Sequence, residues 1–341
     1  MPNDPEGPTD PTSLIAPRGA ADAANPAPPA PRRPAVTRTP ATRTPAGRAS
    51  AGRTPAGEVI EQLGFEGMPA RLFVCTPSKL AAYEDCPRRY RHAYLDRPTP
   101  PKAPQWAHNS LGASVHTALR NWYGLATERR TTGALPTLLR TTWVREGYRD
   151  EEQERAAYAT ALGWLEGYLA TLDPLVEPLG VERTVATKTG LLALSGRVDR
   201  IDQRGEELVI IDYKTGRQAP DIDDARGSAA LALYAYAAGR SLHRPCHRVE
   251  LHHLPTGTLA AHEHTDASLQ RVVTRAEALA ADAQAGEAAM RDGADPDEAF
   301  PVRPSALCAY CDFRRVCPAG AAAPVREPWS ALSQALAGPA G

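Results

Sequence analysis

The segment ELVIIDYKTG, residues 207–216, joins a strand-like apolar run to two opposite charges. The run from Leu208 to Ile211 is typical of a strand that is covered by protein. It stops at Asp212, and Lys214 follows two positions later, so both charges point to the same face of the strand. Any fold of this chain therefore places a carboxylate and an ammonium group together at the end of a buried strand.

A second acidic residue belongs to the preceding strand segment, GRVDRID. The polar loop DQRGEE between the two segments centres a hairpin near Gly205 and Glu206. Counting outward from that centre places Asp199 opposite Asp212, and opposed carboxylates repel one another because their Cβ atoms are only ~5 Å apart. A divalent cation is the natural partner of such a pair. The pattern predicts a metal site beside Lys214, and the alternative is a surface ion pair worth less than ~1 kcal/mol.

Helical and strand patterns alternate around this hairpin. Apolar residues recur at helical spacing in five segments: residues 76–95, 113–124, 155–172, 230–242 and 267–285. Strand patterns occupy three segments: residues 181–202, 207–216 and 247–257. This order, with helices before a short sheet and then helix, strand and helix, predicts an α/β core with a helical N-terminal addition.

Length and charge limit the class of protein. A chain of 341 residues with 42% hydrophobic and 23% charged residues forms one large domain or two small ones. Its net charge of -1 gives no overall basic character, so a nucleic acid would be bound by local clusters. No apolar run approaches the ~18 to 20 residues of a membrane span, and no secretory signal begins the chain. We expect a cytoplasmic protein without a membrane partner, in which clustered cysteines indicate metal rather than disulfides.

The two ends of the chain have compositions that do not build a core. Residues 1–67 are mostly Pro, Ala, Thr, Arg and Gly, which predicts a disordered tail. A solvated tail is favoured over a weak DNA-tethering arm of spaced arginines, and a third interpretation places the translation start near Met68. Residues 319–341 are again rich in Ala, Pro and Gly and are expected to form a flexible tail. The predicted domain is therefore 68–318.

The strings GRVDRID and IIDYKTG together resemble the RecB-family nuclease domain, a branch of the PD-(D/E)XK superfamily. TPSKLAAYEDCPRRY is similar to the N-terminal cysteine-bearing helix of that family, and GASVHTAL to its histidine helix. LALYAYA is similar to the helix after the lysine strand, and CAYCDFRRVCP to the C-terminal cysteine cluster. The resemblance covers residues 73–318 in the expected order. It implies a restriction-endonuclease-like core with a short mixed sheet.

The resemblance also implies a catalytic metal site. The family pattern makes His116, Asp199, Asp212 and the Tyr213 carbonyl the ligands, and it places Lys214 beside the attacking water and the scissile phosphate. Oxygen ligands suit Mg²⁺ or Mn²⁺, and the added imidazole favours Mn²⁺. Without the resemblance, the preferred interpretation of His116 is a helix histidine bonded to a backbone carbonyl.

Two further residues are secondary candidates. Glu182, in VERTV, is either another acid of the site or a solvated strand residue. Tyr234 matches the tyrosine of the helix after the lysine strand, but the Gln that similar proteins often carry four residues earlier is Ala230 here. The metal ligands do not depend on this amide, so its loss is expected to affect catalytic efficiency or substrate handling rather than the fold.

Four cysteines form a second group. Cys308, Cys311 and Cys317 are spaced C-x₂-C-x₅-C, and Cys86 precedes them by 222 residues. Four thiolates suit either structural zinc or an iron–sulfur cluster, and the spacing alone leaves both open. The resemblance to the iron–sulfur nucleases of the family, including the CRISPR-associated exonucleases, favours a [4Fe-4S] cluster. Its expected role is to clip the N-terminal helices to the C-terminal end.

Basic residues beside these cysteines are candidate DNA contacts: Arg88, Arg89, Arg91, Arg314 and Arg315. Such side chains contact phosphates, although a solvated helix face has the same pattern. The chain contains no G-x₄-G-K-[ST] phosphate loop, so we expect a nuclease that acts alone or with a separate helicase.

These features predict a metal-dependent DNA nuclease, with an exonuclease of DNA repair or processing as the favoured form and single-stranded DNA as one substrate option. A non-catalytic DNA-binding or scaffold protein is the rival from another class. A nuclease that cleaves RNA by the same chemistry differs only in its substrate.

Overall fold

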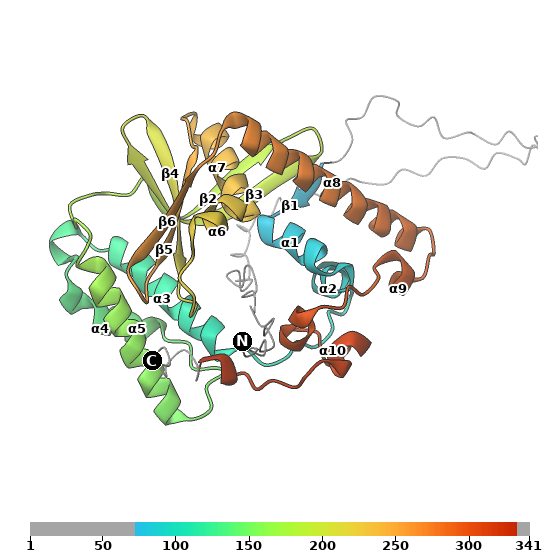
Figure 1. Cartoon of the computed structure of the whole chain (residues 1–341), viewed down its shortest axis with the longest axis horizontal. Helices are drawn as coiled ribbons and strands as arrows, with labels where there is room; N and C mark the ends of the chain where they lie inside the picture. The colour runs from blue at the N-terminus through green and yellow to red at the C-terminus, as the bar shows by residue number, and fades with distance from the viewer. Residues whose placement is uncertain (1–71, 333–341) are drawn as a thin grey trace, which may run out of the picture. The chain divides into compact units, whose positions relative to one another are not determined.

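The computed structural model describes residues 72–332 (Figure 1). The predicted disordered tail, residues 1–67, lies outside this range together with its arginines and Met68. Residues 333–341 lie outside it as well. Within the described range, no helix is both long enough and apolar enough to cross a membrane.

The described residues contain a six-stranded mixed sheet. Five strands follow one path, β1 (Phe73–Cys75), β3 (Leu192–Arg204), β4 (Glu207–Lys214), β5 (Arg248–His253) and β6 (Thr258–Glu263), and β2 (Gly180–Lys188) also pairs with β3. Strand β3 is antiparallel to β2 and β4, whereas β1–β3 and β4–β5 are parallel pairs. With helices on both faces, this sheet confirms the predicted α/β class with a short mixed sheet.

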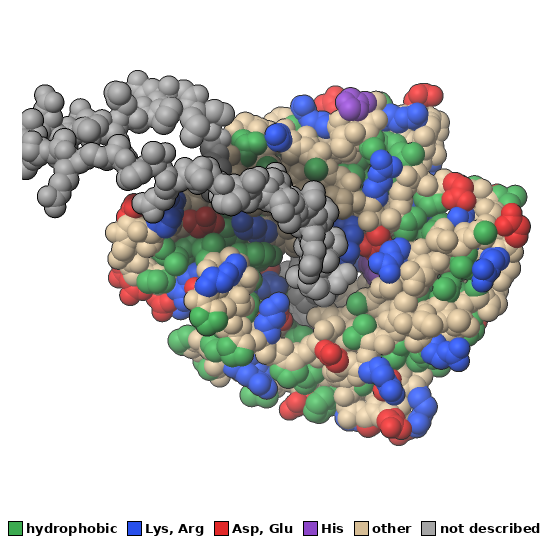
Figure 2. Space-filling model, turned by 180° about the vertical axis from the view of Figure 1, so that it is seen from behind, with side chains coloured by type: hydrophobic (Ala, Val, Ile, Leu, Met, Phe, Trp, Pro, Cys, Tyr) green, Lys and Arg blue, Asp and Glu red, His purple; other side chains and the backbone are tan. Residues whose placement is uncertain are grey.

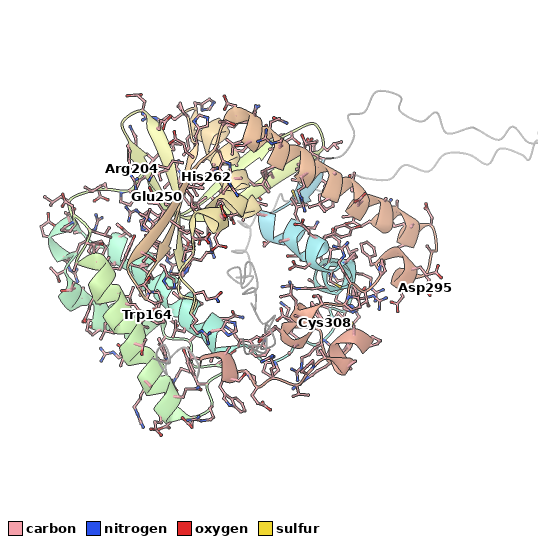
Figure 3. The ribbon with its side chains drawn as sticks, viewed as in Figure 1. Trp164, Arg204, Glu250, His262, Asp295 and Cys308 are labelled. Atoms are coloured by element: carbon pink, nitrogen blue, oxygen red, sulfur yellow. The ribbon has the colours of Figure 1, made fainter. Side chains whose placement is uncertain are left out.

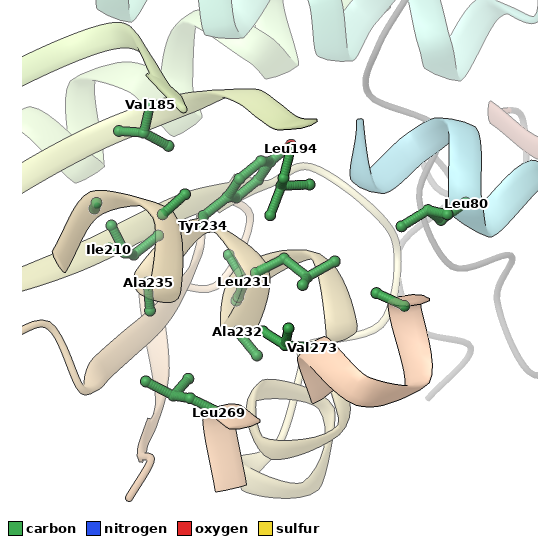
Figure 4. Packing of buried hydrophobic residues seen from close by; sticks show 14 of the residues in the cluster. Leu80, Val185, Leu194, Ile210, Leu231, Ala232, Tyr234, Ala235, Leu269 and Val273 are labelled. Atoms are coloured by element: carbon green, nitrogen blue, oxygen red, sulfur yellow. The ribbon is translucent and has the colours of Figure 1, made fainter. Parts of the chain in front are cut away.

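Four helices lie on one face of the sheet. Two of them, α6 (Ile222–Gly227) and α7 (Ala229–Leu242), form the crossover between the parallel strands β4 and β5. The other two are α8 (Asp266–Arg291) and α1 (Pro77–Asp85). Figure 4 shows Ile210 and Leu194 of the sheet near Leu231 and Tyr234 of α7. Each fully buried aliphatic side chain of this kind stabilises the fold by about 1.5–3 kcal/mol.

Three other helices cover the opposite face: α3 (Ala107–Tyr123), α4 (Leu135–Thr142) and α5 (Glu151–Leu169). Val209, Ile211 and Tyr213 of β4 belong to the core on this side, while Leu208 and Ile210 belong to the core beneath α7. The alternation is the two-residue period of a strand. Because β4 is covered on both faces, its apolar residues run without interruption.

The predicted segments correspond to observed elements, with different boundaries. Segment 76–95 is divided at Cys86 into α1 and α2 (Pro87–Tyr90), followed by a π-helical turn, Arg91–Leu95. Strands β1 and β6 were not predicted, because FVC is too short and TLAAHE too polar and alanine-rich to give a strand signal. The remaining short helices are Thr127–Arg129, Thr132–Ala134, α9 (Pro296–Ala299), Ala306–Tyr310 and α10 (Pro318–Ala322).

The described structure continues past the predicted domain boundary at residue 318. Residues 319–332 pack against the domain: the Ala107 N–H donates to the Pro328 carbonyl at 3.1 Å, and Leu332 is buried with α3 and α5. The segment has the composition of a tail, but Leu332 is buried against helices that are distant in the sequence. Residues 319–332 therefore belong with the domain in the described part of the chain.

Candidate metal centre

The strands β3 and β4 separate at the two aspartates that the sequence places opposite each other. Their hydrogen-bonded ladder ends with Arg200 opposite Ile211, so Asp199 and Asp212 occupy the next pair of positions, as counted from the hairpin turn. At that point the Tyr213 backbone N–H donates to Asp199 Oδ2 at 3.0 Å. A side chain thus replaces the next ladder bond, and the two strands open into a fork.

Helix α3 brings His116 to this fork. Its Nδ1 lies 3.2 Å from Asp199 Oδ2, and its Nε2 lies 3.1 Å from the Tyr213 carbonyl oxygen. The Tyr213 ring meets the imidazole edge-on. The bond to a backbone carbonyl is the contact expected of a structural helix histidine, but here the same ring also faces a carboxylate.

Strand β2 supplies Glu182 on the other side of β3. The register pairs Val181 with Arg200, so Glu182 is level with Asp199. Its φ of 48° is uncommon for a residue other than glycine, and backbone strain of this kind clusters at functional sites. Three carboxylates, from β2, β3 and β4, therefore lie in one row across the sheet.

Three of these side chains come close enough to share one cation. One ligand atom from each of His116, Glu182 and Asp199 lies within 4.8 Å of the other two. Glu182 Oε2 is also 2.7 Å from Arg197 Nε, a partner that sequence reasoning missed. A second hairpin count, outward from the bond between Gly190 and Leu191, places Glu182 opposite Asp199 and is a sequence signal for the role of this acid.

Asp212 and Lys214 form the remaining part of the site. Lys214 Nζ lies 2.7 Å from Asp212 Oδ2, and 39% of the lysine side chain is exposed, against 20% of the aspartate. The predicted same-face placement of this pair is confirmed. Asp212 is not in the three-residue group, because its carboxylate is turned to Lys214.

The charges at the fork shift the pKa values in opposite directions. Burial opposes the charged form of His116, but Asp199 and the other carboxylates raise its pKa to about 9. Although burial works against it, the His116 charge and the hydrogen bonds lower the pKa of Asp199. Burial raises the pKa of Asp212 despite Lys214, and burial followed by Asp199 raises that of Glu182. The crowded carboxylates thus lack enough positive charge for all of them to ionise easily.

These donors fit a divalent cation. Two carboxylates, one imidazole and the Tyr213 carbonyl form a mixed set of oxygen and nitrogen ligands, which suits Mg²⁺ and Mn²⁺ rather than a thiophilic ion. A cation here would relieve the repulsion that burial leaves between Glu182, Asp199 and Asp212.

A sequence model described as the PD-(D/E)XK nuclease superfamily matches residues 74–318. The chain belongs to the PD-(D/E)XK nuclease superfamily. Members of this superfamily are nucleases that typically use Mg²⁺ or Mn²⁺, in agreement with the donors at the fork. Asp212 and Lys214 on β4 have D-x-K spacing, and Asp199 lies on the preceding strand, β3.

Comparison with other proteins adds little to this assignment. One solved structure, described as "Crystal structure of SSO0001", shares 16% identity, and the match covers 72% of this chain and 87% of that chain with a TM-score of 0.35. A likeness at this level is too weak to support an argument. No curated protein matches the chain.

The cysteines of this superfamily member lie where its N-terminal helices meet its C-terminal segment. Cys86 separates α1 from α2, and its Sγ accepts a hydrogen bond from the Arg303 N–H at 3.4 Å. Cys308 Sγ accepts one from Ser305 at 3.4 Å, and burial raises the pKa of the nearby Cys311 thiol to about 11. Figure 3 shows Cys308 on this C-terminal segment. Residues more than two hundred positions apart are thus joined here.

The candidate DNA-contacting arginines differ in their surroundings. Arg88 and Arg91 are each 8% exposed and pair with Asp297, and Arg88 also donates to the Phe300 carbonyl. We assign these two side chains to packing within the fold, in place of the DNA contact expected from the sequence. The other three arginines are more accessible. Arg89 pairs with Asp85, Arg314 donates hydrogen bonds to two backbone carbonyls, and Arg315 is exposed.

Tyr234, the secondary candidate on α7, is buried in the core. Its ring lies directly over Gly196 of β3, where a Cβ atom would collide with it. A glycine is therefore required opposite this tyrosine. Packing against Gly196 is therefore sufficient to explain a tyrosine at position 234. Ala230 is also partly buried against the same core.

Proposed function

We propose that this chain is a metal-dependent DNA nuclease of the RecB-like, iron–sulfur branch, acting as an exonuclease in DNA repair or processing in the cytoplasm. The observation that carries the proposal is the group of His116, Glu182 and Asp199, whose ligand atoms lie within 4.8 Å of one another beside the Asp212–Lys214 pair. A binding or scaffold protein does not need buried, mutually repelling carboxylates next to a lysine.

Each residue at the fork then has a distinct task. His116, Glu182, Asp199 and the Tyr213 carbonyl would hold the cation, which when bound lowers the pKa of a bound water and neutralises phosphate charge. Asp212 holds the Lys214 ammonium group at 2.7 Å and keeps it charged, since the neighbouring carboxylate raises the lysine pKa. Lys214 in turn offers that charge to the scissile phosphate.

The four cysteines are proposed to hold a [4Fe-4S] cluster rather than zinc. The support is the resemblance in the cysteine pattern, together with the position of Cys86, whose Sγ accepts the Arg303 N–H and so lies beside the segment that carries the other three cysteines. Protein purified without oxygen should be brown and contain iron; colourless protein with stoichiometric zinc would reject the cluster.

The test of the nuclease is a time course on end-labelled DNA, single-stranded and duplex, with Mg²⁺ or Mn²⁺. Wild-type protein should shorten the DNA only with metal, while Lys214→Ala and Asp212→Ala should not. Lys102→Ala, at an exposed lysine outside the site, is the matched control and should cleave normally. The ladder of products reports the end preference, and RNA of the same sequence reports the sugar preference.

An inactive wild-type protein that still binds DNA would support the scaffold alternative. The chain has no G-x₄-G-K-[ST] loop, so we propose that any unwinding of duplex substrate is done by a separate helicase. Cleavage that stops at the first base pair of a hairpin substrate, and continues when a helicase is added, is the expected result.

A further inference from the structure

A second feature of interest is a pocket of about 310 Å³ at the N-terminal end of α3. Three aromatic and three basic residues contribute to its lining: Trp106, Tyr148, Trp329, Arg314, Arg315 and Arg326. They come from three separate parts of the chain: the residue before α3, the loop before α5, and the C-terminal segment from Arg314 to Trp329, which begins between Cys311 and Cys317. Aromatic rings and arginines combined in one groove are the usual means of binding single-stranded nucleic acid, by base stacking and phosphate contact.

The pocket is built by a close backbone approach. Gly147 has a φ of +88°, and a Cβ at this position would collide with the backbone of Gln105, Trp106 and Ala107. Only glycine therefore allows the loop to press against the start of α3. This contact holds Tyr148 beside Trp106 as two walls of one pocket.

Two buried polar groups in these walls have no partner within the described part of the chain. Trp106 is 4% exposed, and its indole N–H makes no hydrogen bond there. The Tyr148 hydroxyl is likewise buried without a partner. A buried donor without a partner costs free energy comparable to a lost hydrogen bond, so a ligand or water atom that reached either group would lower this cost.

The charge of the pocket suits a phosphate. Arg314, Arg315 and Arg326 contribute three positive charges, and Glu327 contributes one negative charge. Arg314 donates to the carbonyls of Ala309 and Arg326, which fastens the C-terminal segment in place. Arg315 is exposed and therefore accessible to an incoming phosphate.

Helix α3 connects this pocket with the metal centre. Trp106 immediately precedes the helix and His116 lies ten residues later, a distance of about 15 Å at 1.5 Å per residue. Between them Asn109, Gly112 and Ala113 are half-buried and share one face of the helix with His116, while Ser110 and Val115 are buried. Gly112, in the middle of this face, lies against the Thr215 side chain, next to Lys214, so the face reaches the fork.

We propose that this pocket binds one nucleotide of a single-stranded polynucleotide, with the base against Tyr148 and Trp329 and the phosphate on Arg315 and Arg326. The strand then follows α3 to the fork, so the nucleotide in the pocket lies a few nucleotides from the scissile phosphate. A volume of about 310 Å³ is near the lower end for ligand pockets and suits one nucleotide rather than a base pair. The path of the polynucleotide from the pocket towards His116 rests on the proposed nuclease function. Binding in the pocket can be tested without it.

The test is fluorescence anisotropy with a labelled oligothymidylate of about ten nucleotides, in EDTA so that no cleavage occurs. Arg315→Ala and Trp329→Ala should each weaken binding about tenfold, and Arg315→Ala should lower the salt dependence by about one counterion. The matched control is Arg271→Ala, at an exposed arginine of α8, which should bind like wild type. If Trp329→Ala fails to fold, Arg315→Glu, at an exposed position, decides the question with a larger expected loss.

Unchanged binding by folded Arg315→Ala and Arg315→Glu would overturn the proposal. Equal affinity for a duplex of the same length would overturn the single-strand preference. If wild-type protein never cleaves DNA but its DNA binding depends on the pocket residues, the nuclease proposal is rejected and the pocket proposal is supported. If wild-type protein cleaves DNA but its DNA binding does not depend on the pocket residues, the pocket proposal is rejected and the nuclease proposal is supported.

Discussion

Two groups of buried charges lie on the same sheet, and they are balanced differently. Glu250 on β5 is fully buried, and Arg204 donates two hydrogen bonds to it at 2.6 and 2.9 Å. Arg248 donates another at 2.7 Å, and His252 Nε2 lies 3.0 Å from the same carboxylate. Figure 3 shows Arg204 and Glu250 close together on the sheet. Every oxygen of this acid has a partner within the protein.

The fork at the end of β4 has the opposite balance. Glu182, Asp199 and Asp212 share a small space with Lys214 and His116. Burial raises the pKa of two of these acids, whereas the hydrogen bonds from His252 and the two arginines overcome burial and hold the pKa of Glu250 well below its usual range. The charges around Glu250 are balanced within the protein and therefore stabilise the fold. The group at the fork has more negative than positive charge and therefore favours binding of a cation. Substitutions at the two places should therefore fail in different ways.

The largest expected effect is on catalysis at the fork. Asp199→Asn should reduce DNA cleavage at least about a thousandfold, because the cation loses a charged ligand. The melting temperature should fall only slightly, since the amide oxygen can still accept the Tyr213 N–H while His116 loses the charge of its carboxylate partner. Initial rates and thermal melting, beside an Asp223→Asn control on α6, measure both quantities. A variant with a wild-type rate would remove Asp199 from the site.

The second effect is on stability at Glu250. Glu250→Gln should lower the free energy of unfolding by about 2 kcal/mol, because a fully buried side chain loses its charge-assisted hydrogen bonds to Arg204, Arg248 and His252. Cleavage per folded molecule should stay normal. Urea unfolding of this variant, with exposed Glu263→Gln as the control, provides the measurement. Loss of cleavage without loss of stability would show that the two groups of charges do not have separate roles.

Binding of the cation itself should stabilise the protein by a smaller amount. At a Mn²⁺ concentration ten times its dissociation constant, the gain is about 1.4 kcal/mol for one site. The shift in melting temperature should appear in wild type and in Glu250→Gln, and disappear in the double variant Glu182→Gln with Asp199→Asn. A shift that survives in the double variant would place the cation elsewhere.

The smallest effect is a loss of stability at low pH. The folded pKa of Glu250 is depressed, so its contribution is complete above the unfolded value of about 4.3 and declines as the pH falls through that value towards the folded pKa. At pH 4 the expected loss is about 0.6 kcal/mol. The difference in urea midpoint between wild type and Glu250→Gln should therefore narrow below pH 5. A constant difference down to pH 3 would contradict the assignment.

Local contacts in this protein were predictable, and contacts between distant segments were much less so. The place of Asp199 opposite Asp212 follows from a short turn and a two-residue period, and the observed register has that spacing. The DNA contact predicted for Arg88 and Arg91 stays a prediction, but both side chains are buried because they pair with Asp297, about two hundred residues later, and Arg88 also donates to the Phe300 carbonyl. Charge alone does not reveal whether a distant segment will bury a side chain.

The sequence by itself determined the α/β class, the hairpin that aligns two aspartates and the placement of Lys214 beside Asp212. These features depend on residues close in the chain, where strand period and turn length leave few options. Only the tertiary structure decided that α3 brings His116 to Asp199, that the strands open into a fork there, and that residues 319–332 contribute to a pocket at the start of α3. Those contacts depend on how separately formed helices and strands pack, which is set by the burial of surfaces that are far apart in the sequence.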